Sequence, residues 1–255
     1  IKYKIVFLLL FIPLCTAQAA TLTERQSLIR QLVQRIEILQ QEVRLFQLLL
    51  ANMKMATQQN YITAPSYLAV NPSDNSVLLE KNSGQIHSIA SVTKLMTAVI
   101  ALENINPEQK ITLTNQMLKP LGHSPALFGG LNITGENLLK AALIQSTNDA
   151  AEALTYFPPA GGRKKFILLM NQKAKELEMI NTSFVDPHGL SENNRSSASD
   201  LAKLLAYIYK NHPEILNITK NNNFWLPDKT GKLIKFQNVN NFYPLDNFSG
   251  GKTGY

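Results

Sequence analysis

The stretch Ile89-Ala90-Ser91-Val92-Thr93-Lys94-Leu95-Met96-Thr97-Ala98 places a hydroxyl and an amine three residues apart at the start of an apolar segment. Residues 91–103 are predicted to be helical. A spacing of three residues then puts both side chains on one helical face, about 5–6 Å apart at Cβ. Lys94 can therefore take the proton of Ser91, and the helix N-terminus favours negative charge that develops beside it. Because the pattern is common by chance, it needs supporting residues elsewhere.

Supporting groups occur in two later segments. Ser146-Thr147-Asn148 adds a second hydroxyl and a carboxamide, and Lys252-Thr253-Gly254, preceded by Gly250-Gly251, adds a second cation. These are the groups that a serine–lysine acyl-transfer site requires. The order Ser-x-x-Lys, Ser-x-Asn, Lys-Thr-Gly makes a specific signature. A second Lys-Thr-Gly, at 229–231, follows Pro227-Asp228 and is predicted to be a hairpin turn.

At this point the chain resembles the penicillin-binding serine acyltransferases, most closely the D-alanyl-D-alanine carboxypeptidases of low molecular mass. The likeness runs from about residue 62 to the last residue. It is carried, in family order, by Ala64-Pro65-Ser66-Tyr67, the segment 89–98, Ser146-Thr147-Asn148-Asp149-Ala150-Ala151 and Phe184-Val185-Asp186-Pro187-His188-Gly189-Leu190. It implies a β-lactamase/transpeptidase-like fold, an α+β domain with an antiparallel sheet and a helical subdomain, and no cofactor or metal.

The resemblance also implies roles for individual residues. Ser91 attacks the carbonyl of the penultimate D-alanine, Lys94 is the base, and Ser146 relays the proton to the leaving amine. The implied substrate-binding residues are Asn148, Lys252, Thr253, Gly254 and Tyr255. Backbone N–H groups of Ser91 and Tyr255 form the implied oxyanion hole. The implied ligands are peptidoglycan peptides ending in D-Ala-D-Ala and β-lactam antibiotics as acylating inhibitors.

Lys94 must be neutral to act as a base near pH 7, which requires a pKa well below the free value of about 10.4. A second ammonium about 4 Å away contributes about 4 kcal/mol at an effective dielectric constant of 20. That energy equals roughly three pKa units, and burial adds to it. We therefore expect Lys252 to lie beside Lys94.

The first residues predict export. Lys2 and Lys4 precede the apolar run 5–14, and Ala17-Gln18-Ala19 forms a small-x-small cleavage site, so residues 1–19 are predicted to be a signal peptide. A buried N-terminal helix or an uncleaved anchor is the alternative. The predicted location is the periplasm or the extracytoplasmic face of the cell envelope.

Residues 20–60 are predicted to form a heptad-repeat helix and a linker. The seam positions are Leu22, Arg25, Ile29, Leu32, Ile36, Leu39, Val43, Phe46, Leu50 and Met53. Only one of them is polar, which predicts a helix about 48 Å long that pairs with a partner. The alternative is a single amphipathic helix lying on the following domain or on a membrane surface. Residues 56–61 are the expected linker.

Residues 61–255 are predicted to form the acyltransferase-like domain. Strands at 66–70 and 76–80 and at 223–226 and 232–237 form hairpins, with helices at 91–103, 135–156, 163–178 and 199–211 between them. We expect the terminal strands to share one sheet. The family has further strands after its third motif, so we expect the domain to be incomplete at its C-terminus, the edge of the Lys252 strand to be unpaired, and the chain as given to have little activity.

Two other functions compete with this interpretation. A class A β-lactamase shares the three motifs and adds a Glu for deacylation; Glu178 is the nearest candidate, but its spacing to Asn181 is one residue short. A coiled-coil wall protein with a degenerate fold is the non-enzymatic alternative. The net charge of +7 suits nucleic acid, anionic lipid or cell wall, and no phosphate loop or aromatic–basic stripe favours nucleic acid. The single cysteine excludes a disulfide framework.

Overall fold

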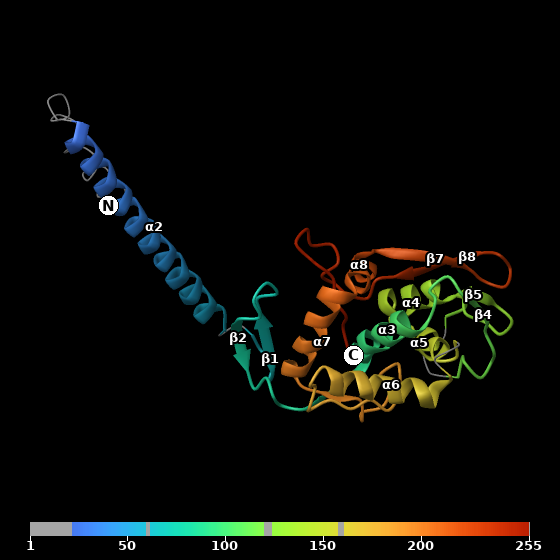
Figure 1. Ribbon diagram of the computed structural model, residues 1–255. Helices are drawn as coiled ribbons and strands as arrows, with labels where there is room; N and C mark the ends of the chain where they lie inside the picture. Colours follow the sequence, from blue (N-terminus) through green and yellow to red (C-terminus); the bar gives the residue numbers. More distant parts are fainter. Residues whose placement is uncertain (1–21, 60–61, 120–123, 158–160, 255) are drawn as a thin grey trace. The chain divides into compact units, whose positions relative to one another are not determined.

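A computed structural model describes residues 22–59, 62–119, 124–157 and 161–254 (Figure 1). The chain divides into two compact units, Ile1–Thr63 and Ala64–Tyr255. The described part of the first unit is helix α2, Leu22–Gln59. The predicted linker at 56–61 was therefore placed too early, because helix continues to Gln59. The predicted signal peptide lies outside the described residues.

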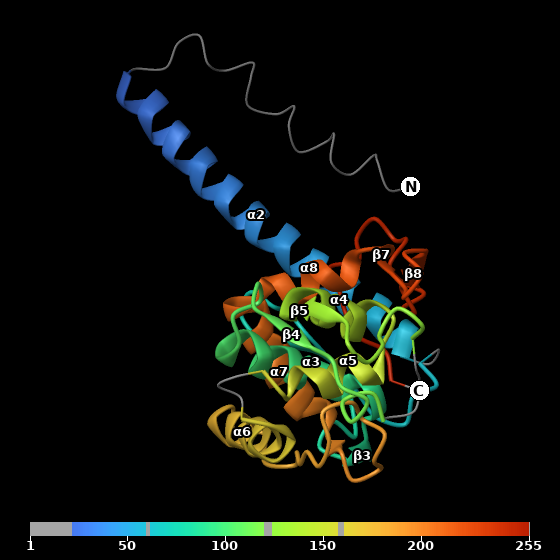
Figure 2. The ribbon, with the colours of Figure 1, turned by 90° about the vertical axis from the view of Figure 1, so that its right-hand side faces the viewer.

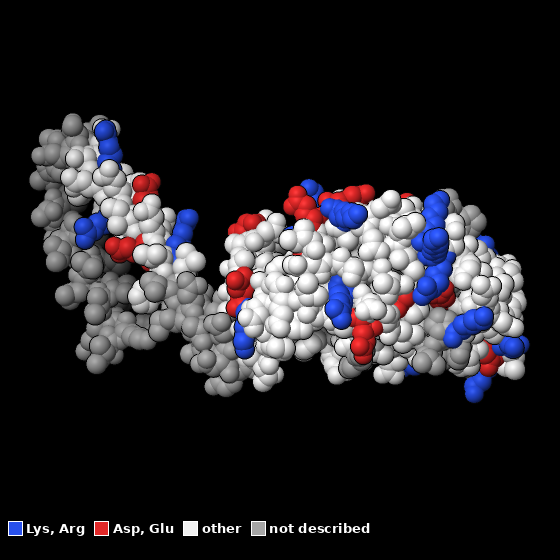
Figure 3. Space-filling view, turned by 90° about the horizontal axis from the view of Figure 1, so that it is seen from below, with Lys and Arg blue, Asp and Glu red and all other residues white. Residues whose placement is uncertain are grey.

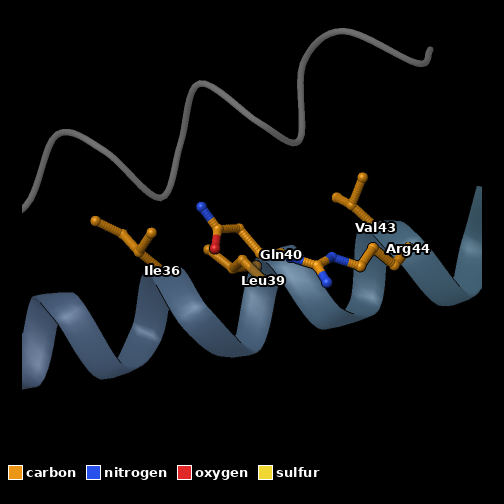
Figure 4. Close-up of a pocket in the computed structure, with 5 residues that line it drawn as sticks. All are labelled: Ile36, Leu39, Gln40, Val43 and Arg44. Carbon is orange, nitrogen blue, oxygen red and sulfur yellow. The ribbon is translucent and has the colours of Figure 1, made fainter.

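Helix α2 carries a row of exposed apolar side chains. Ile29, Leu32, Ile36, Leu39, Val43 and Phe46, all at predicted seam positions, are 46–67% exposed. Figure 4 shows Ile36, Leu39 and Val43 projecting from the same side of the helix, with Gln40 and Arg44 beside them. The seam positions thus form a row of exposed apolar side chains from Ile29 to Phe46.

The second unit places helices between short strand pairs. Its helices are η2 (Ala90–Val92), α3 (Thr93–Asn104), α4 (Gly135–Ile144), α5 (Asn148–Leu154), α6 (Arg163–Glu176), α7 (Ala198–Asn211) and α8 (Pro213–Lys220). Its strands are β1 (Tyr67–Val70), β2 (Val77–Lys81), β3 (His87–Ser88), β4 (Lys110–Thr112), β5 (Asn132–Thr134), β6 (Arg195–Ser196), β7 (Asn223–Pro227) and β8 (Leu233–Gln237).

The strands pair antiparallel as β1–β2, β3–β6, β4–β5 and β7–β8. Both predicted hairpins are confirmed. The expectation that terminal strands share one sheet was wrong, because among the described residues each pair forms its own two-stranded sheet. The segment 249–254 forms no strand, so the predicted Lys252 strand is also absent.

Helix α3 is the centre of the core. Residues 93–101 are all buried, and the helix packs against α4, α5, α6 and α8 (Figure 2). Met96, Val99 and Ile100 are at most 1% exposed. Thr134 caps α4 as predicted, its side chain accepting a hydrogen bond from the Asn137 N–H. Lys94, the candidate base, is thus part of a rigid, close-packed helix.

The surface has no strongly segregated charge on the face seen in Figure 3, where basic and acidic side chains are scattered among uncharged ones. Within the described ranges, no helix is both long enough and apolar enough to cross a membrane.

Candidate active site

Ser91 lies in the single 3-10 turn η2, between strand β3 and helix α3. Ala90 has φ +43°, a left-handed conformation that a residue with a side chain rarely adopts. The turn is held by the Ile89 N–H, which donates to the Asn194 carbonyl oxygen at 3.0 Å. Strained residues of this kind persist where the surrounding structure fixes them, and they gather at functional sites.

Lys94 is buried beside Ser91, with an exposed fraction of 1%. Its Nζ atom lies 3.0 Å from Ser91 Oγ, 2.8 Å from Asn148 Oδ1 and 2.6 Å from the His188 carbonyl oxygen. An ammonium has three donors, so these three acceptors satisfy it completely. The predicted contact between Ser91 and Lys94 is therefore present, and the second motif meets the first through Asn148.

A break between two helices places Ser146 and Asn148. The single helix predicted at 135–156 is two helices, because Ser146 has φ +63° and turns the chain. Asn148 is the first residue of α5 and extends its carboxamide to Lys94. Ser146 lies in the same turn, two residues earlier, and is partly exposed. The predicted single helix overlooked this break, although the five polar residues at 145–149 interrupt the apolar pattern there and are the signal that could have located it.

The C-terminal segment runs along the Ser91 turn. A Cβ on Gly254 would lie 2.8 Å from the Ile89 carbonyl oxygen and 3.2 Å from Val92 Cγ2, so only glycine allows this close approach. Thr253 Oγ1 is buried and has no hydrogen-bond partner among the described residues. Tyr255 lies outside them. The third motif thus lies beside the turn that carries Ser91.

Both lysines have lowered pKa values. Burial, followed by the charge of Lys252, lowers the pKa of Lys94 from 10.5 to about 7, while the charge of Asp186 opposes the shift. Burial lowers the pKa of Lys252 to about 8. Lys94 can therefore be neutral near pH 7 while Lys252 still carries its charge. Burial lowers the pKa of Lys94 more than the charge of Lys252 does, whereas we expected Lys252 to make the larger contribution.

Sequence reasoning missed the loop at 186–191 as a part of the site. Thr97 Oγ1 donates to the Pro187 carbonyl oxygen at 2.5 Å, one helical turn from the contact between Lys94 and the His188 carbonyl. Every residue has a backbone carbonyl, so no sequence motif could have predicted these two acceptors. The sequence analysis used the segment 184–190 only as a part of the family resemblance.

These groups bring a serine hydroxyl and a buried amine into hydrogen-bond contact, the arrangement that a serine–lysine acyl-transfer site requires. Among the described residues no cluster of His, Cys, Asp and Glu has the arrangement of a metal site.

Residues 53–255 match peptidase family S11, D-alanyl-D-alanine carboxypeptidase, and the chain belongs to this family. The chain is 42% identical to a D-alanyl-D-alanine endopeptidase of Haemophilus influenzae over 151 residues, covering 58% of the chain and 51% of that relative. It is 34% identical to the D-alanyl-D-alanine endopeptidase of Escherichia coli over 200 residues, covering 75% and 62%. It is 33% identical to the D-alanyl-D-alanine carboxypeptidase DacF of Bacillus subtilis, covering 75% and 51%. The chain thus spans about half to three fifths of the length of these curated relatives.

Solved structures show the same fold. The D-alanyl-D-alanine carboxypeptidase of Mycobacterium tuberculosis superposes with a TM-score of 0.69 at 25% identity, covering 75% of this chain and 73% of that one. Penicillin-binding protein D2 of Listeria monocytogenes, solved in a cefotaxime-bound form, gives a TM-score of 0.64 at 28% identity, covering 76% and 80%. The predicted transpeptidase-like α+β fold is confirmed.

Proposed function

We propose that this chain belongs to a serine-type D-alanyl-D-alanine carboxypeptidase that trims peptidoglycan stem peptides through an acyl-enzyme on Ser91. The observation that carries the proposal is the position of Lys94 Nζ, 3.0 Å from Ser91 Oγ and 2.8 Å from Asn148 Oδ1. Membership of the family and likeness to carboxypeptidases support the substrate class. Within this proposal β-lactams are acylating inhibitors, as the cefotaxime-bound relative suggests.

In the proposed reaction, neutral Lys94 takes the Ser91 proton as Oγ bonds to the carbonyl carbon of the penultimate D-alanine. The peptide C–N bond then breaks. The proton passes from Lys94 through Ser146 to the leaving amine, and free D-alanine departs. Water next attacks the ester, gives a proton back to Ser91 and releases the shortened peptide. Asn148 orients both Lys94 and the substrate amide.

Binding of the terminal carboxylate is assigned to the third motif. Lys252 supplies a positive charge near Lys94, and the buried Thr253 hydroxyl has no other partner among the described residues. A carboxylate placed there gains a charge-assisted hydrogen bond. The N–H of Ser91, with that of Tyr255, is assigned to the developing oxyanion.

Endopeptidase action on D-alanyl cross-links is the second candidate, favoured by the 42% and 34% identity to two endopeptidases. The same groups serve both reactions, so the substrate decides between them. A β-lactamase would differ in hydrolysing the acyl-enzyme rapidly.

Fluorescent penicillin tests the proposal in the protein that contains this chain. We expect covalent labelling that Ser91→Ala abolishes and that Ser73→Ala, at an exposed loop serine, leaves intact. Release of D-alanine from a stem pentapeptide identifies the carboxypeptidase, and cleavage of a cross-linked dimer identifies the endopeptidase. Rapid nitrocefin turnover would point to a β-lactamase instead. Absence of labelling in the wild type would leave a non-catalytic wall protein.

We also infer export, with residues 1–19 as the signal and helix α2 as an assembly element. The basic, apolar and small-residue order of residues 2–19 supports export. The exposed row that includes Ile36, Leu39 and Val43 supports pairing with a second copy. Sedimentation of the mature chain tests this pairing. Leu39→Glu is expected to convert a dimer to a monomer, whereas Glu42→Gln, outside the seam, is expected to leave the dimer intact. A monomeric wild type that binds anionic vesicles would favour membrane-surface contact.

A further inference from the structure

The loop behind Lys94 contains a buried histidine that the proposed reaction does not use. His188, Asp186 and Glu152 have side chains only 4–7% exposed. His188 Nδ1 lies 3.0 Å from Asp186 Oδ1, and His188 Nε2 lies 3.6 Å from Glu152 Oε2. The Arg163 guanidinium lies 3.2 Å from the Glu152 carboxylate, on the outer side of this cluster. A buried imidazole between two carboxylates is unusual, since uncompensated buried charge is costly.

The same histidine holds Lys94 through its backbone. The His188 carbonyl oxygen accepts the 2.6 Å hydrogen bond from Lys94 Nζ. Asp186 organises the turn that presents this carbonyl: its Oδ1 accepts from the N–H groups of His188 and Gly189, and its Oδ2 from the N–H of Ser191. The position of the carbonyl therefore depends on how the Asp186 carboxylate is fixed.

Asp186 also acts on Lys94 through its charge. The negative charge of Asp186 favours the protonated form of Lys94, which is inactive as a base. His188 makes the largest favourable contribution to keeping the pKa of Asp186 well below its usual range, against the opposing effect of burial. The contact of 3.0 Å between His188 Nδ1 and Asp186 Oδ1 stabilises the charge of that carboxylate and weakens its effect on Lys94.

We propose that His188 is a positioning residue for Lys94: clamped between Asp186 and Glu152, its side chain fixes its own carbonyl against the Lys94 amine and moderates the Asp186 charge behind it. This inference rests on the proposed function. The charged groups around the pair are Lys252 on the Lys94 side, Glu152 from α5 and Arg163 from α6. The predicted consequence is that the proton affinity of Lys94 depends on a side chain that never touches the substrate.

The test is the pH profile of acylation by fluorescent penicillin in His188→Asn. Without the imidazole, Asp186 stays ionised through its three backbone N–H donors but loses the ring that shares its charge, so the acid limb is expected to move up by about one pH unit, which is about a tenfold loss of rate below the midpoint. The matched control is His212→Asn, because His212 also lies between two carboxylates, 3.4 Å from Glu103 and 3.3 Å from Glu214, without contacting Lys94. The control is expected to keep the wild-type midpoint.

A purely structural role would lower the rate equally at every pH, and an unmoved midpoint would overturn the inference. Asp186→Asn tests the relation from the other side, since removing that charge is expected to move the midpoint down; it also serves if His188→Asn does not fold. NMR titration of ¹³C-lysine-labelled protein reads Lys94 directly. If penicillin does not label the wild type but His188→Asn still moves the Lys94 titration, the proposed function fails and this inference stands. If labelling occurs and the titration does not move, this inference fails and the proposed function stands.

Discussion

The Nζ atom of Lys94 lies 3.0 Å from the hydroxyl oxygen of Ser91. Lys94 belongs to the stretch 93–101 of helix α3, in which every residue is buried. Burial lowers the pKa of Lys94 to about 7. The packing that forms the core therefore also sets the proton affinity of Lys94.

The first prediction concerns Lys94→Arg. A guanidinium stays protonated at every accessible pH, so it cannot take the Ser91 proton, and we expect acylation by fluorescent penicillin to fall about 10²–10⁴-fold. The control is Lys140→Arg, at a surface lysine paired with Glu136 at 2.8 Å, which should leave the rate unchanged. Labelling of Lys94→Arg at the wild-type rate would show that another group is the base.

The part of this site that the sequence could predict is the part carried by local spacing. A separation of three residues on a helix is enough to bring Ser91 and Lys94 together, and the structure confirms it. The contact with Asn148 spans 54 residues and depends on the helix break at Ser146. The family resemblance implied that Asn148 belongs to the site, but nothing local signals its contact with Lys94.

The remaining part depends on backbone groups and on long-range packing. The carbonyl oxygens of Pro187 and His188 hold α3 side chains, and any sequence provides carbonyls, so a motif cannot identify them. The Lys-Thr-Gly at 229–231 shows the opposite case. It is a hairpin turn as predicted, because the Asp228 carboxylate accepts from the Thr230 and Lys232 N–H groups. The hydrogen bonds of a turn join residues that are close in sequence, so the turn can be predicted from the sequence.

The second prediction is a bell-shaped pH dependence of acylation. The rate should rise as Lys94 loses its proton near its pKa of about 7 and fall as Lys252 loses its charge near its pKa of about 8. In Lys252→Met the alkaline limb should vanish, and the acid limb should move to higher pH because the Lys252 charge no longer lowers the pKa of Lys94. Stopped-flow labelling from pH 5 to 10 measures both limbs. An acid limb that stays in place in Lys252→Met would refute the coupling.

The third prediction concerns stability against pH. The pKa of Lys94 is about 7 in the folded chain and 10.5 in the unfolded chain. Between these values the unfolded state binds a proton that the folded state lacks, so the free energy of unfolding rises with pH, by at most about 1.4 kcal/mol per unit. Below about pH 7 both states are protonated and this slope disappears.

Urea unfolding of the wild type and of Lys94→Met at pH 6, 7, 8 and 9 checks the third prediction. The difference in unfolding free energy between the two proteins should stay level from pH 6 to 7 and then change steadily in favour of the wild type. Lys140→Met, at a partly exposed ion pair, should show no such trend. A constant difference across the range would mean that Lys94 keeps its proton when folded.

The fourth prediction compares two glycines with nearly equal φ, Gly189 at +88° and Gly130 at +90°. A Cβ at Gly130 meets nothing within 4 Å, so Gly130→Ala should cost only the backbone strain of about 1–2 kcal/mol. A Cβ at Gly189 would collide with the Ala90 carbonyl and would lie 2.9 Å from the Ser91 nitrogen, so Gly189→Ala should cost about 3 kcal/mol or more. Because the collision pushes on the turn that carries Ser91, Gly189→Ala should also slow penicillin labelling in the fraction that remains folded, whereas Gly130→Ala should label normally. Equal losses in the two variants would show that the loop yields, and that the close packing of Gly189 against Ala90 does not hold Ser91 in place.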